Sequence, residues 1–99
     1  MNDHPDQRPP AGWEQQDQAL VAVFTPVSFT VGADFVRQIA EVADEINHHP
    51  ELTLEYGKLT VRLFSHDADN TVTKRDIRLA HRIEDLAEQA GIPRYSAES

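Results

Sequence analysis

The period of the apolar residues changes along this chain, and that change restricts the fold more than any other feature. Between Thr30 and Asn47 apolar side chains recur at helical spacing, whereas from Leu59 to Phe64 they alternate with polar ones. A helical period returns after Thr73. Because helices and strands bury the face on which their apolar residues recur, the pattern predicts two helices separated by a hairpin.

The boundaries of these elements follow from turn and cap residues. The apolar segment from Ala19 to Phe24 predicts a strand, which resumes at Val27–Phe29 after a break or bulge at Pro26. Thr30 is a candidate N-cap of the first helix. That helix must stop near His48 or His49, since the proline that follows disfavours helical geometry at the residue before it.

The second half of the chain predicts a hairpin and a helix. Leu52–Tyr56 and Leu59–Phe64 form the two strands, joined by a glycine turn. Thr73–Asp76 resembles a capping box, which opens the second helix. Gly91 and Pro93 then end it.

Size and composition restrict the chain to one domain. It has 99 residues, of which 39% are apolar, so it can build one core of modest stability that association would help. Three prolines among polar residues make 1–12 a flexible tail. We therefore predict a domain over 13–93, followed by a short C-terminal tail over 94–99.

Charge and cysteine content exclude several classes of function. Seventeen acidic residues against nine basic ones give a net charge of -8, which would repel both nucleic acid and an anionic membrane surface. There is no cysteine, so no disulfide, thiolate zinc site or thiol nucleophile is available. With no apolar stretch long enough to span a membrane and no signal-peptide pattern, we expect a cytoplasmic protein.

Histidines and acidic residues are concentrated in the middle of the chain. His48 and His49 lie together before Pro50, and His66 follows within nineteen residues of the first. Asp44 lies one helical turn before this pair, and Asp76 lies near the start of the second helix. Imidazole exchanges protons near neutral pH, so the cluster predicts acid/base chemistry.

The full spacing closely resembles the signature of the pterin-4a-carbinolamine dehydratase family. It reads Asp44, three residues, His48-His49-Pro50, then Tyr56, His66 and Asp76. The resemblance covers roughly residues 12 to 90, from Gly12-Trp13 to the second helix. It implies an α+β fold, with two long helices packed on one face of an antiparallel sheet of about four strands.

The resemblance also implies an activity, namely the dehydration of 4a-hydroxytetrahydropterin to quinonoid dihydropterin in tetrahydrobiopterin recycling, with no cofactor. The implied catalytic residues are His48, His49 and His66. The implied supporting or substrate-binding residues are Asp44, Asp76 and Trp13. The expected ligand is a pterin, and the expected assembly is a homodimer or homotetramer.

On physical grounds, each site residue has a specific expectation and an alternative. Asp44, four residues before His48 on the same helix face, is expected to hydrogen-bond its ring and fix which nitrogen meets substrate. The histidine pair could instead be a polar helix end, and Asp76 could be a cap alone. Trp13 could merely close the core edge, and we expect Tyr56 to serve packing.

A zinc site is the second chemical interpretation of three histidines, because three histidines with an open position form a catalytic zinc geometry. Adjacent side chains at a helix end diverge by roughly 100°, so His48 and His49 do not readily converge on one ion. We therefore predict a site without a metal.

Two alternatives of function remain open at this point. The first is an enzyme, and the second is a non-catalytic relative that serves as a binding, scaffold or transcriptional-cofactor module. The sequence departs from many family members at Leu52, where they carry tryptophan, and over Asp67–Thr71, where they carry glycine.

Overall fold

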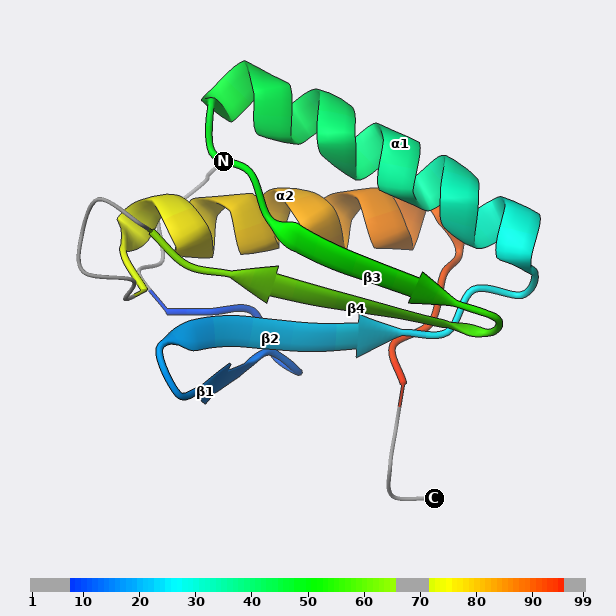
Figure 1. Cartoon of the computed structure of the whole chain (residues 1–99), viewed down its shortest axis with the longest axis horizontal. Helices are drawn as coiled ribbons and strands as arrows, with labels where there is room; N and C mark the ends of the chain where they lie inside the picture. The colour runs from blue at the N-terminus through cyan, green and yellow to red at the C-terminus, as the bar shows by residue number, and fades with distance from the viewer. Residues whose placement is uncertain (1–7, 66–71, 96–99) are drawn as a thin grey trace.

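Two helices that run in opposite directions cover one face of an antiparallel sheet (Figure 1). The computed structural model describes residues 8–65 and 72–95. Within them the elements are β1 (Glu14–Gln16), β2 (Ala19–Phe24), α1 (Phe29–Ile46), β3 (Glu51–Glu55), β4 (Lys58–Leu63) and α2 (Lys74–Ala90). The strands lie in the order β1-β2-β4-β3. The predicted α+β fold, with two helices on a four-stranded sheet, is confirmed.

The core lies between the sheet and the helices. β4 alternates, with Leu59, Val61 and Leu63 fully buried and the residues between them partly exposed. Ile39 of α1 and Ile83 of α2 belong to the same buried cluster as these β4 residues and are also fully buried. Truncating one such side chain to alanine costs about 2–5 kcal/mol of stability. The core therefore holds the ends of the elements in fixed positions.

β1 was not predicted as a strand. Its three residues are polar and exposed, so no alternation marks them. It forms because Asp17, with φ of 56°, turns the chain back and pairs Gln16 with Ala19. A polar edge strand of this kind is specified by its turn rather than by its pattern.

α1 begins earlier than expected. Its N-cap is Ser28, whose side chain accepts a hydrogen bond of 3.1 Å from the Val31 N–H, so the prediction of Thr30 is wrong. The predicted resumption of the strand at Val27–Phe29 is also wrong, because Phe29 is already helical. Serine is at least as favourable an N-cap as threonine, so N-cap preference gives no reason to place the start of the helix at Thr30.

α1 also ends before the histidines. Asn47 adopts the left-handed conformation, with φ of 58°. The His48 N–H then donates to the Ala43 carbonyl at 3.0 Å, which satisfies one of the free carbonyl groups at the C-terminal end of the helix. The chain therefore leaves the helix axis at Asn47, and both histidines lie in the connection to β3.

α2 follows its prediction closely. The Thr73 N–H donates to the Asp76 carboxylate at 2.8 Å, as in a capping box, and Gly91 with φ of 69° ends the helix. The chain then returns to the sheet, where the Tyr95 N–H donates to the Val23 carbonyl at 2.8 Å. The described chain thus makes a backbone contact with β2 after the end of α2. Neither helix of the described ranges is long and apolar enough to cross a membrane.

The solvent face of α1 carries a local charge cluster. Arg37 donates to Asp34 at 2.9 Å and to Glu41 at 2.6 Å. The hydrogen bond from Arg37, aided by one from Gln38, lowers the pKa of the Asp34 carboxyl, and the pKa of Arg37 is raised by the same hydrogen bond. The charged side chains Asp34, Arg37 and Glu41 are exposed, so the cluster contributes little to stability.

Candidate active site

The C-terminal end of α1, the N-terminal end of α2 and the end of β4 lie at the same end of the molecule (Figure 1). The antiparallel arrangement of the two helices brings these ends together. His48 follows α1, Asp76 lies in the first turn of α2, and Ser65 follows β4. Residues far apart in sequence therefore meet at one place.

His48 and Asp76 form a buried pair at this place. Their Nε2 and Oδ1 atoms are 2.5 Å apart, and the two residues are 8% and 0% exposed. Because an ionised carboxylate only accepts hydrogen bonds, Nε2 carries the proton of this contact. Asp76 also accepts the Thr73 N–H, so its roles as helix cap and as partner of a site histidine coexist.

Asp44 pairs with His49 and not with His48, so the predicted hydrogen bond between Asp44 and His48 is wrong. The Oδ1 atom of Asp44 lies 2.9 Å from Nε2 of His49. Helical spacing places residues four apart on one face, but that rule stops at Asn47, where the backbone turns. The side chains of Asp44 and His49 are 78% and 58% exposed, so this second pair lies in solvent.

The two histidines therefore occupy different environments. His48 is held by a buried carboxylate, whereas His49 lies on the surface with an exposed one. Buried charge-assisted hydrogen bonds orient an imidazole more strongly than exposed ones, because water does not compete for the donor. The geometry thus distinguishes a fixed imidazole from a solvated one at adjacent positions.

Trp13 contacts α2 at a point further along that helix than Asp76. Its Nε1–H donates to Glu84 at 2.8 Å, and its ring meets Phe24 edge-on at 6.2 Å. Glu84 follows Asp76 by eight residues, which corresponds to about 12 Å along a helix. The contacts of Trp13 are those of a residue that closes the core.

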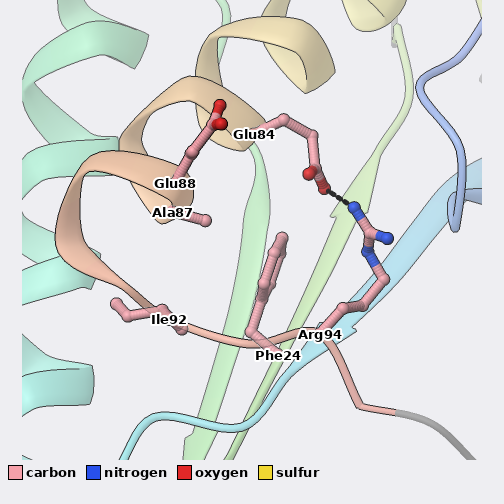
Figure 2. A pocket seen from close by; sticks show the side chains of 6 residues that line it. All are labelled: Phe24, Glu84, Ala87, Glu88, Ile92 and Arg94. Atoms are coloured by element: carbon pink, nitrogen blue, oxygen red, sulfur yellow. Dashed lines mark ion pairs between the residues drawn. The ribbon is translucent and has the colours of Figure 1, made fainter.

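A cavity of about 340 Å³ lies at this other end of α2. Its lining is Phe24, Glu84, Ala87, Glu88, Ile92 and Arg94. Figure 2 shows the Glu84 and Arg94 side chains pointing toward one another, joined as an ion pair. The lining includes neither His48 nor His49, so this cavity is separate from these two histidines.

Several predicted features lie outside the described residues or in solvent. His66 and the segment Asp67–Thr71 are not among the residues described. Among the residues that the structure describes, no three metal-ligating side chains group together. Tyr56 is 88% exposed, so the expectation that it serves packing is wrong within the single chain.

Ser65 is a site residue, among those the structure describes, that the sequence did not indicate. It is 0% exposed, and its hydroxyl donates to the second carboxylate oxygen of Asp76 at 2.8 Å. A serine at the end of an alternating strand carries no signal of its own. Only the fold shows that its side chain meets the first turn of α2.

The fold and the site define a small α+β domain with a buried imidazole–carboxylate pair where its two helices meet. The chain belongs to the pterin carbinolamine dehydratase family, since the family model described as Pterin 4 alpha carbinolamine dehydratase matches residues 2–86.

The comparisons with individual proteins agree with this assignment. A candidate pterin-4-alpha-carbinolamine dehydratase of Thermomicrobium roseum is 40% identical over 76 residues, which are 77% of this chain and 81% of that protein. One of Natronomonas pharaonis is 38% identical over 79 residues, which are 80% of this chain and 85% of that protein.

Two solved structures share the fold. A transcriptional coactivator/pterin dehydratase from Brucella melitensis has a TM-score of 0.72 and 32% identity, over 78% of this chain and 83% of that one. A pterin dehydratase-like RuBisCO assembly factor of the alpha-carboxysome has a TM-score of 0.66 over 83% of this chain and 96% of that one. At 18% identity, the second shows the fold alone.

Proposed function

We propose that this chain dehydrates a 4a-hydroxytetrahydropterin to the quinonoid dihydropterin, with His48 as the principal proton-exchanging group. The observation that carries the proposal is the buried 2.5 Å contact between His48 and Asp76. Membership of the dehydratase family supports the pterin as substrate.

The reaction requires two proton movements. The hydroxyl on C4a leaves as water after it gains a proton, and a ring nitrogen of the pterin loses one. An imidazole near neutral pH can give or take such a proton. No electrons are exchanged with another molecule, so proton transfer and substrate positioning account for the whole step.

The pairing supports separate roles for the two nitrogens of His48 in this proposal. Nε2 is committed to Asp76, which leaves Nδ1 to exchange a proton with the pterin. Asp76 fixes the tautomer and the ring orientation without itself reacting. His49 acts as a second, solvated imidazole beside it, and His66 stays the third predicted member of the site.

The test is the rate of quinonoid dihydropterin formation above the spontaneous background. His48→Ala should lower this rate by about 10² to 10⁴-fold, the usual contribution of a positioned acid or base. His49→Ala should lower it less, because that ring is solvated. His81→Ala is the matched control, since His81 lies on α2 and its ring contacts the backbone of Arg8.

A non-catalytic binding module is the second candidate function. The Brucella relative is described as a transcriptional coactivator as well as a pterin dehydratase, which favours keeping this candidate. Its discriminating result is a wild-type protein that binds pterin but adds nothing to the spontaneous rate. That result would favour the non-catalytic binding module over the dehydratase as the function of this chain. The place of the reaction in tetrahydrobiopterin recycling and the cytoplasmic location stay predictions.

A further inference from the structure

Ser65 is the most completely buried hydroxyl next to the histidine pair, and neither the family spacing nor the proposed chemistry uses it. Its side chain is 0% exposed, in a position where an unpaired hydroxyl would be costly. Two polar side-chain atoms at the start of α2 satisfy it, one on the N-cap residue Thr73 and one on Asp76. The Oγ atom lies 2.8 Å from Asp76 Oδ2 and 2.8 Å from Thr73 Oγ1.

The direction of these hydrogen bonds is determined by the carboxylate. An ionised Asp76 has no proton to give, so the single hydroxyl proton of Ser65 goes to Oδ2. The Ser65 oxygen must then accept the proton of Thr73 Oγ1. A direct bond from Thr73 Oγ1 to Oδ2 would be longer, at 3.4 Å. The short contacts therefore form one series of hydrogen bonds, each with a defined donor, from Thr73 through Ser65 to Asp76.

This series of hydrogen bonds ends on one carboxylate oxygen of Asp76 and leaves the other oxygen to His48. Oδ2 accepts both the Ser65 hydroxyl and the Thr73 N–H, each at 2.8 Å. Two donors on one oxygen fix the rotation of the carboxylate about its Cβ–Cγ bond. Oδ1 is then held toward the imidazole, where Nε2 of His48 lies 2.5 Å away.

We propose that Ser65 is a positioning residue for His48, acting through Asp76 to hold the imidazole in the orientation in which Nδ1 meets the substrate. The proposal rests on the proposed function for its effect on turnover, but not for its effect on the ring. Without the Ser65 hydroxyl, Oδ2 keeps the Thr73 N–H, while the carboxylate gains freedom to rotate. The contact with His48 then loosens although the helix cap remains.

The experiment compares Ser65→Ala and Ser65→Thr with the wild-type protein. Loss of a hydrogen-bond partner that orients a metal-bound histidine typically costs about 10- to 100-fold in activity, and we expect a similar loss for an imidazole oriented in the same way without a metal. We expect Ser65→Ala to lower kcat within that range with KM unchanged, because the substrate contacts stay in place. Ser65→Thr retains the hydroxyl and should restore kcat.

The second readout needs no substrate. In nitrogen-15 NMR spectra of the wild-type protein, the Nε2–H of His48 should give a resonance protected from exchange with water. In Ser65→Ala this resonance should exchange faster or disappear, while the fold is retained. If the wild-type protein shows no turnover, the proposed function fails, and this resonance still decides whether Ser65 positions the ring.

Two further variants separate positioning from stability. Ile39→Val lowers stability by about 0.5–1.5 kcal/mol from the core and should change neither kcat nor the resonance. Thr73→Val removes the hydroxyl that donates to Ser65 together with the side-chain half of the α2 capping box, so its resonance is compared with that of Ile39→Val, which is also destabilised. It replaces Ser65→Ala should that variant not fold. A folded Ser65→Ala with wild-type kcat and an unchanged His48 resonance would overturn the proposal.

Discussion

The carboxylate of Asp76 serves the backbone of α2 and the ring of His48 at the same time, with no exposure to solvent. Asp76→Asn keeps the size of the side chain but brings an amide N–H group among the donors around it. At least one of these donors is then left without an acceptor, which costs about 1–3 kcal/mol. We expect that loss in the free energy of unfolding, measured by urea titration, together with a loss of turnover.

Asp44→Asn is the matched control for that variant. The Asp44 side chain is 78% exposed and pairs with His49 in water, so its replacement should change stability by less than about 0.5 kcal/mol. Equal losses of stability in the two variants would contradict the assignment of Asp76 as the buried partner.

The spacing of the histidines and carboxylates predicted the members of this cluster, but it did not predict which carboxylate pairs with which imidazole. The prediction joined Asp44 to His48 because a helix was expected to continue to the histidines. One residue, Asn47, changes the direction of the chain and moves the carboxylate to the next imidazole. Pairing across the fold, as between Ser65 and Asp76, depends on the packing of β4 against α2 and has no local signal.

The end of α1 offers a test at Asn47. Its φ of 58° is a conformation that asparagine tolerates and β-branched residues do not. Asn47→Val should therefore lower the free energy of unfolding by about 1–2 kcal/mol. Because His48 is the next residue, the variant should also reduce turnover. Urea titration and the dehydratase assay measure the two effects.

Asn47→Gly is the informative partner of that variant, because glycine adopts the left-handed conformation without steric cost. It should keep both stability and turnover close to those of the wild-type protein. A similar loss in both variants would show that the Asn47 side chain, rather than its backbone, is what matters.

Elements with two independent local signals were predicted well. α2 has a capping box at its start and a glycine at its end, and both are used as predicted. β1 has no signal except its turn, and α1 has competing caps at Ser28 and Thr30.

The two ends of the described chain are joined through α2. Glu84 accepts a hydrogen bond from Trp13 near one end and pairs with Arg94 near the other (Figure 2). Glu84→Ala removes both contacts at once. Hydrogen bonds to charged groups contribute about 1.5–3 kcal/mol each when buried. Since Glu84 and Arg94 are about one quarter exposed, we expect a loss near the lower value, measured by urea titration.

Glu88→Ala is the control, because Glu88 lines the same cavity and is exposed. Turnover should be unchanged in both variants at temperatures where they are folded, because the histidine pair lies at the other end of α2. A loss of turnover in folded Glu84→Ala would contradict this separation of stability from chemistry.

Association of several copies is the expectation that concerns the whole molecule. β3 is an edge strand, and the apolar side chains of Val27 and Tyr56 are 87% and 88% exposed. Pro26 and Leu54 both lie close to Gly32, so the loop before α1 and the end of β3 are neighbours. Exposed apolar side chains that gather at one end of a small domain are typical of an interface.

We therefore expect the wild-type protein to be a dimer or larger at micromolar concentration, measured by light scattering. The double variant Val27→Ser, Tyr56→Ser should shift the mass toward the monomer, because it removes apolar area that association would bury. Lys58→Ser, on the same hairpin, removes a charge without removing a large apolar side chain and should leave the mass unchanged. A wild-type protein that is monomeric under these conditions would contradict the expectation. A double variant with unchanged mass would instead place the interface on another edge or on a helix face.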